Sequence, residues 1–117
     1  MLIEQHRIEK PWGYEVIWAK TGRYVGKVLV INGNHRLSRQ YHKIKEETIM
    51  VNSGTLLLEI GPPGEERELV LKEGDNFHIK PNTVHRFSAP FGTVELFEVS
   101  TPELNDVVRL EDDYNRE

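Results

Sequence analysis

Short apolar or alternating segments separated by turn-forming residues make up most of the chain. Gly, Asn and Pro cluster between these segments, where Gly and Asn permit a positive φ angle and Pro restricts it. Strands that recur about every 8–12 residues, with no long helical pattern, are typical of an all-β sandwich or barrel. The segments predicted as strands are 14–18, 24–31, 48–51, 55–60, 67–71, 76–79, 84–88 and 93–100.

The two ends of the chain depart from this pattern. Residues 1–12 carry Leu2, Ile3 and Ile8 ahead of a Pro-Trp-Gly turn, which predicts an arm or edge strand that pairs with another subunit. A homodimer is therefore expected. The highly charged tail, residues 103–117, is compatible with a helical turn or an extended arm. With 117 residues the chain has the size of one domain, so a site is expected within one barrel or between subunits.

Charge and composition exclude several classes of function. The net charge is -4, with Lys and Arg scattered among acidic residues, so nucleic acid is not an expected partner. The chain has no Cys, so a metal site must use nitrogen and oxygen. The first residues lack the apolar core of a signal peptide, and no segment approaches the ~20 apolar residues that span a bilayer. A cytoplasmic protein with no membrane partner is expected.

A first group of polar residues lies between positions 36 and 47. If residues 36–42 are extended, side chains of alternate residues share one face, which would bring together Arg36, Ser38, Gln40 and His42. Residues 43–46 are short enough to form a turn, after which Glu47 would return on the neighbouring strand facing the same way.

A second group follows at residues 74–87. Alternation there places Phe77 and Ile79 inward and, after a turn at residues 81–82, returns His85 inward as well. One amide oxygen, two imidazoles and one carboxylate would then meet. Such ligands suit a single Zn²⁺, Mn²⁺, Fe²⁺, Co²⁺ or Ni²⁺ ion and leave coordination positions open for water or substrate. The predicted metal ligands are Gln40, His42, Glu47 and His85.

Both groups resemble the two sequence motifs of cupins. Residues 33–54 are similar to the first motif, a glycine followed by two spaced ligands, a glutamate and a closing glycine, with Gln40 where many cupins have His. Residues 74–85 are similar to the second motif, although Lys80 and Asn82 replace the usual Pro and Gly. Asn tolerates the left-handed conformation that Gly would supply. The resemblance implies a single cupin domain over residues 1–117, a double-stranded β-helix or jelly-roll barrel.

The resemblance extends to the cupin domain of type II phosphomannose isomerases. It is carried by Lys10-Pro11-Trp12-Gly13, by Gln40-Tyr41-His42, and by residues 107–114 near the end of the chain. It implies interconversion of an aldose phosphate and a ketose phosphate, with mannose 6-phosphate and fructose 6-phosphate as the type pair. A proton would move between C1 and C2 through an enediol, with the metal as Lewis acid and a nearby base.

Four further residues are predicted to act on such a substrate. Glu98 alternates with Phe97 and Val99, so it is expected to point into the barrel, where apolar surroundings would raise its pKa and make it a usable base. It could instead pair with a Lys or Arg. Lys27 is predicted to contribute a second catalytic charge. Arg36 and Arg86 are the predicted substrate-binding residues, because a guanidinium binds phosphate in a bidentate way.

Two other functions fit the same sequence. One is a non-catalytic cupin that binds a sugar or sugar nucleotide through its metal and assists a partner enzyme. The other is an iron-dependent dioxygenase, since a His and Glu ligand set also occurs in oxygenases.

Overall fold

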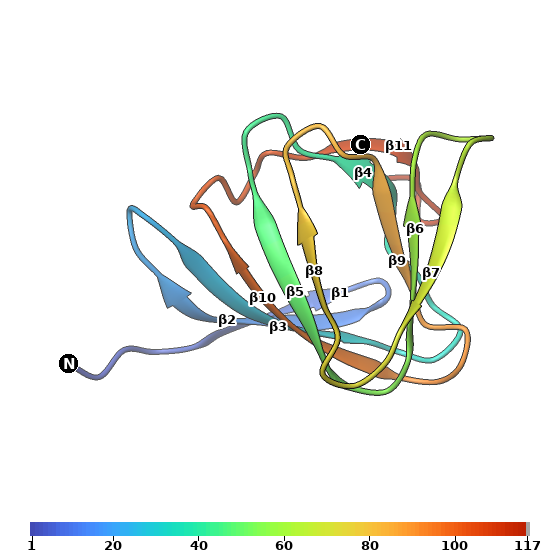
Figure 1. Ribbon diagram of the computed structural model, residues 1–117. Coiled ribbons are helices and arrows are strands. Elements are labelled where there is room, and N and C mark those ends of the chain that lie inside the picture. The colour runs from blue at the N-terminus through green and yellow to red at the C-terminus, as the bar shows by residue number, and fades with distance from the viewer. Residues whose placement is uncertain (117) are drawn as a thin grey trace.

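Figure 1 shows the computed structural model, which describes residues 1–116, as two antiparallel sheets folded around a common interior. Every regular element of these residues is a strand, and none of them forms a helix that could span a membrane. The six-stranded sheet has the order β1 (His6–Lys10), β2 (Gly13–Lys20), β3 (Val25–Ile31), β10 (Val94–Ser100), β5 (Glu47–Ser53), β8 (Asn76–Ile79). The five-stranded sheet has the order β11 (Val108–Glu111), β4 (Arg39–Tyr41), β9 (His85–Ser88), β6 (Leu56–Ile60), β7 (Arg67–Leu71).

Two-residue alternation explains how these strands build the interior. In β10, Leu96 and Glu98 are buried while Phe97 and Val99 are exposed, because successive side chains point to opposite faces of a sheet. The predicted all-β cupin fold and its single domain are confirmed. The apolar core that both sheets share consists of Trp12, Leu29, Ile31, Leu37, Ile49, Val51, Leu56, Leu58, Ile79, Phe87, Ala89, Val94 and Leu96.

Strands near both ends of the described residues join the two sheets. The predicted edge strand exists as β1, which pairs with β2 of the same chain. The C-terminal tail, for which a helical turn and an extended arm were both compatible, forms strand β11 and pairs with β4. Asp113 lies between two guanidinium groups, 2.7 Å from Arg36 Nε and 3.2 Å from a terminal nitrogen of Arg86, and so fixes the tail to the barrel.

The turns have the backbone conformations that the sequence predicts. Asn82 has φ 64° and so adopts the left-handed conformation expected where other cupins have Gly. Gly54 turns the chain between β5 and β6 with φ 83°, and a Cβ at this position would lie 2.5 Å from the carbonyl oxygen of Thr93. The closing glycine of the first motif is therefore required for two reasons, a left-handed backbone and contact with a neighbouring turn.

We predict that Gly54→Ala costs more stability than Gly64→Ala. Gly64 also has a positive φ, 87°, but a Cβ there meets no atom within 4 Å. Gly64→Ala should lower the free energy of unfolding by about 1–2 kcal/mol through backbone strain alone. Gly54→Ala adds a clash with backbone atoms and should cost about 2–5 kcal/mol in total. Urea unfolding of both variants measures the difference, and equal losses would contradict the proposed contact with Thr93.

Candidate metal centre

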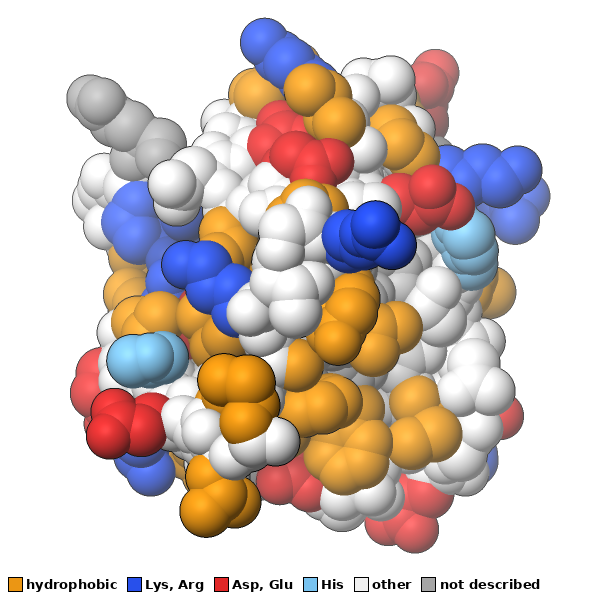
Figure 2. Space-filling view, turned by 90° about the vertical axis from the view of Figure 1, so that its left-hand side faces the viewer, with side chains coloured by type: hydrophobic (Ala, Val, Ile, Leu, Met, Phe, Trp, Pro, Cys, Tyr) orange, Lys and Arg blue, Asp and Glu red, His pale blue; other side chains and the backbone are white. Residues whose placement is uncertain are grey.

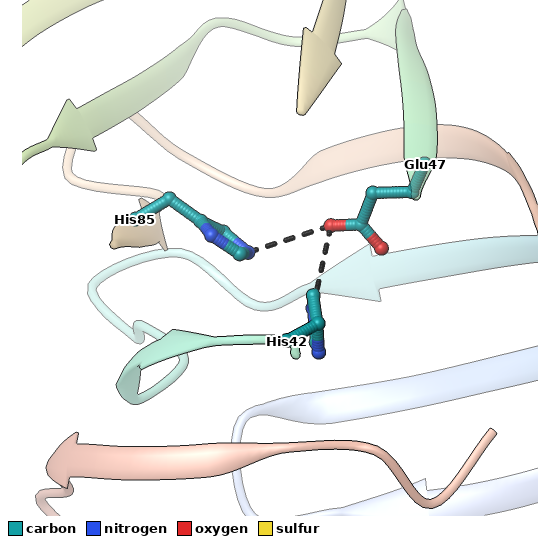
Figure 3. A group of neighbouring side chains, drawn as sticks. All are labelled: His42, Glu47 and His85. Carbon is teal, nitrogen blue, oxygen red and sulfur yellow. Dashed lines mark ion pairs between the residues drawn. The ribbon is translucent and has the colours of Figure 1, made fainter. Parts of the chain in front are cut away.

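Three of the four predicted metal ligands meet inside the barrel. His42 follows directly after β4, Glu47 begins β5 and His85 begins β9, so both sheets contribute. All three side chains are buried. Figure 3 shows the two imidazoles and the carboxylate pointing toward one another, as the alternation of the two motifs predicts.

The distances between the ligand atoms fit a shared ion. Glu47 Oε1 lies 3.8 Å from His42 Nε2 and 3.4 Å from His85 Nε2. One ligand atom from each residue can be chosen so that all three lie within 4.8 Å of one another. Donor atoms that bind the same divalent ion, each at about 2.0–2.2 Å, lie roughly as far from one another as these three atoms do. The residues present therefore fit a divalent metal.

Backbone carbonyls determine which imidazole nitrogens face the centre. His42 Nδ1 lies 2.5 Å from the carbonyl oxygen of Asp106, and His85 Nδ1 lies 2.8 Å from that of Thr83. A carbonyl oxygen can only accept, so each Nδ1 carries the hydrogen and donates it. Each Nε2 atom then faces the Glu47 carboxylate: it donates a hydrogen bond to the carboxylate when the ring is protonated, and it offers a lone pair to a cation when the ring is neutral.

The Glu47 carboxylate is held in its charged form. Burial by itself raises the pKa of this group, but hydrogen bonds with the two imidazoles and the charge of Lys45 outweigh burial and lower the pKa well below its usual value. A metal ligand must be deprotonated to bind. Glu47 is therefore ready to bind a cation at neutral pH.

Lys45 connects the centre to the predicted base, a role that the sequence did not indicate. Its ammonium nitrogen lies 3.0 Å from Glu47 Oε2 and 3.2 Å from Glu98 Oε2, with its side chain almost fully buried. Burial lowers the pKa of Lys45, but the charges of Glu98 and Glu47 more than offset this and raise it above its usual value. The predicted turn over residues 43–46 thus places the charged ammonium group of Lys45 in the interior.

Glu98 and Lys27 both point into the barrel, as alternation predicts. Their Cα atoms are paired across β10 and β3. Burial and the neighbouring charge of Glu47 raise the pKa of Glu98, while Lys45 and Lys27 oppose the rise. Lys27 Nζ also lies 3.4 Å from Glu15 Oε2. Glu98 therefore combines a raised pKa with a lysine partner, two properties that the sequence offered as alternatives.

A cavity of about 240 Å³ opens beside the three ligands. Gln40 lines it, and its amide nitrogen donates to Ser38 Oγ at 3.0 Å, which leaves the amide oxygen as its possible ligand atom. Residues of the C-terminal tail also line this cavity. Its charged lining consists of Lys10, Glu15, Lys27, Lys45, Glu47, Glu98, Arg109 and Arg116.

The two predicted substrate-binding arginines lie outside the lining of this cavity. Arg36 is exposed and bound to Asp113, and Arg86 is buried, with Nε donating to the carbonyl oxygen of Leu37 at 2.8 Å. Residues 36–38 precede β4, so the assumed alternation does not hold there, and Leu37 faces the cavity instead of Arg36. The observed contacts of both arginines hold the tail and the barrel together.

Asp106 holds the loop that carries both His42 and Lys45. Its carboxylate accepts backbone N–H groups of residues 43, 44 and 45 at 3.1, 2.7 and 2.9 Å. These backbone donors lower the pKa of Asp106 to about 2. Since the Asp106 carbonyl also accepts from His42, one tail residue fixes a metal ligand and its loop. No local pattern in the sequence indicates this contact, which spans more than 60 residues.

Comparisons with known proteins agree with this geometry. Residues 2–112 match the family described as mannose-6-phosphate isomerase C-terminal. The alginate biosynthesis protein AlgA of Pseudomonas aeruginosa is 30% identical over 114 residues, which cover 93% of this chain and 23% of AlgA. The chain thus spans about a quarter of that relative's length.

Solved structures share the fold at low sequence identity. The capsular polysaccharide assembling protein CapF of Staphylococcus aureus aligns with a TM-score of 0.79 and 18% identity, over 94% of this chain and 33% of CapF. A Klebsiella pneumoniae protein described as having a double-stranded β-helix domain aligns with a TM-score of 0.72 and 20% identity, over 91% of this chain and 85% of that protein.

We predict that Asp106→Ala weakens metal binding. Loss of its carboxylate releases the loop before Glu47 and the carbonyl that orients His42, so metal affinity should fall about 10- to 100-fold, as for other groups that orient metal ligands. Titration of the purified variant with Zn²⁺ or Co²⁺ measures this. Asp75→Ala is the matched control, because Asp75 also accepts a backbone N–H, from Lys72 at 2.8 Å, but in a turn beyond the other end of β5. Equal affinities for both variants would contradict the role of Asp106.

Proposed function

Because the chain belongs to the mannose-6-phosphate isomerase C-terminal family, we propose that it is a metal-dependent isomerase of a sugar phosphate. The substrate pair to test first is mannose 6-phosphate and fructose 6-phosphate. The observation that carries the proposal is the meeting of His42, Glu47 and His85 beside a cavity that also contains Glu98.

The proposed ion would be held by the two imidazoles, the Glu47 carboxylate and the Gln40 amide oxygen. When bound, it supplies a Lewis acid for the carbonyl and adjacent hydroxyl oxygens of the sugar. The donor set suits Zn²⁺, Mn²⁺, Fe²⁺, Co²⁺ or Ni²⁺, which differ mainly in supply and preferred geometry.

Glu98 is the proposed base. It would take a proton from C2 of the aldose phosphate and return it to C1, while the hydroxyl proton passes from the C2 oxygen to the C1 oxygen. Its raised pKa brings the carboxylate closer to the value at which a base works well near neutral pH. Lys45 and Lys27 would keep Glu98 oriented and limit how far its pKa rises.

The cavity also offers positive charge for a phosphate group. Arg109 and Arg116 line it from the C-terminal tail, and Lys10 lines it from β1. Burial and the charge of Arg116 lower the pKa of Arg109, while the charge of Asp112, which binds Arg116 at 2.9 Å, opposes this change. A phosphate would add negative charge beside the two guanidinium groups. We propose the tail as the phosphate-binding side of the cavity, in place of Arg36 and Arg86.

The names of similar proteins support a sugar-related substrate. One relative takes part in alginate biosynthesis and one structural neighbour in capsular polysaccharide assembly. This chain covers only a fraction of each of those proteins, so their complete activities are not transferred to it. A homodimer and a cytoplasmic location stay predictions.

A non-catalytic sugar-binding cupin is the second candidate. This function is favoured by the ion pair between Lys45 and Glu98. An isomerase would need the Glu98 carboxylate as its base, and the ion pair engages that carboxylate. Saturable binding of a sugar phosphate without turnover would support this function over the first.

We predict that the protein loaded with Zn²⁺ or Mn²⁺ converts mannose 6-phosphate to fructose 6-phosphate. His42→Ala removes one ligand and should abolish both metal binding and turnover. His35→Ala is the control, because His35 lies in an exposed turn after β3. Coupled assay of product and elemental analysis of each protein give the two measurements. Absence of turnover with every hexose and pentose phosphate tested would reject the isomerase.

We also predict that Glu98→Gln lowers kcat by about 10²- to 10⁴-fold, the usual contribution of a general base, while the protein still binds metal. Glu95→Gln is the control, since Glu95 lies on the same strand and forms a hydrogen bond with Asn52 near the turn that follows β5. Steady-state kinetics and metal content of both variants are compared. Unchanged kcat in Glu98→Gln would exclude Glu98 as the base.

A further inference from the structure

The outer face of the six-stranded sheet carries an apolar groove of about 530 Å³, on the side opposite the cavity. Cross-strand pairing places Val16 beside Val28, Val28 beside Phe97 and Phe97 beside Met50, so an apolar row crosses β2, β3, β10 and β5. Figure 2 shows hydrophobic side chains gathered over the lower part of this side of the molecule. The residues lining the groove include no charged side chain.

The Trp18 ring in this groove packs closely on the sheet. A Cβ at Gly26 would lie 2.7 Å from the Trp18 indole, so the ring rests directly on the backbone of β3. Trp18 is nevertheless 45% exposed, Phe97 37% and Val99 53%. Aromatic side chains that remain partly exposed on a surface are typical anchors of protein interfaces.

The N-terminal segment also exposes apolar side chains that the rest of the chain leaves largely uncovered. Residues 1–5 precede β1 and extend away from the barrel (Figure 1). Met1 and Leu2 are fully exposed and Ile3 is 61% exposed. Gln5, at the base of this N-terminal arm, lines the groove. The arm therefore starts at the edge of the surface that it could cover.

The arm and the groove match in length. The row from Val16 continues to Asn76 on β8, which is paired with Met50, and so crosses five strands. Strands spaced by about 4.8 Å make this row about 19 Å long, and five extended residues reach about 17 Å. We propose that the groove binds a second copy of this chain, whose N-terminal arm lies across it in a reciprocal, two-fold symmetric exchange.

The size of the combined surface is consistent with a dimer. A standard interface takes about 20–30 residues from each partner. The ten lining residues and the four that precede Gln5 supply roughly half or more of this number. Ten of these fourteen residues are apolar and only Glu4 is charged, a composition that fits the centre of an interface. Each copy offers one arm and one groove, so a symmetric pair satisfies both and leaves neither exposed.

Sedimentation of the wild-type protein and its variants over a range of concentrations tests the proposal. The wild type should be a dimer. Phe97→Lys places a charge at the middle of the row and should raise the dimer Kd at least about 30-fold, as for an interface anchor. The double variant Leu2→Ser, Ile3→Ser should raise it about tenfold, and cannot disturb the barrel because both side chains are exposed. Val70→Lys is the control, since Val70 is 51% exposed on β7 of the other sheet.

Each outcome decides one part of the proposal. A wild type that stays monomeric, or a dimer that survives Phe97→Lys, would overturn the interface. Loss of the dimer in Phe97→Lys but not in the arm variant would overturn the exchange of arms. Dilution of the wild type should also shift the fluorescence of Trp18 to longer wavelength as its indole becomes exposed to water. Metal content and isomerase assay of the same samples keep this result separate from the proposed function.

Discussion

The buried negative charge of Glu47 is the constraint on which the interior depends. A carboxylate removed from water is costly unless cations and hydrogen-bond donors surround it. Here both Glu47 oxygens face nitrogen atoms, Oε1 those of His42 and His85 and Oε2 that of Lys45. A divalent ion among the same atoms would complete this compensation. The barrel thus keeps a buried carboxylate that fits a metal ion by surrounding it with two imidazoles and the ammonium group of Lys45.

The same constraint explains why the described part of the charged tail, residues 103–116, packs on the barrel. Two of its acidic residues are paired with arginines of the barrel, Asp113 with Arg36 and Arg86 and Glu111 with Arg39. The Asp106 carboxylate accepts hydrogen bonds from backbone N–H groups of the loop between β4 and β5. The tail therefore supplies hydrogen-bond acceptors where the loop would otherwise leave donors unpaired. Its contribution to the site is orientation of the ligands, in addition to the cavity surface provided by Arg109 and Arg116.

The sequence predicted the parts of this structure that follow from regular alternation. In β10 it predicted that Glu98 points inward, and the two motifs identified His42, Glu47 and His85 as residues that meet. It failed where the chain is irregular. Arg36 precedes β4 and faces outward, while Lys45 leaves a short turn to reach the interior. Asp106 could not be predicted, because its contacts depend on how a tail more than 60 residues away folds back.

Alternation along β10 also connects the cavity with the outer groove. Glu98 faces the cavity, while Phe97 and Val99, its neighbours in the chain, face the outer groove. The strand lies between β3 and β5, which carry Lys27 and Glu47, so its register determines where the proposed base lies relative to both charges. A one-residue shift would exchange the two faces and bury Phe97 in place of Glu98. A dimer that covers the outer face of β10 would oppose such a shift. Assembly at the groove would therefore help to hold Glu98 in its position in the cavity, because both faces belong to the same strand.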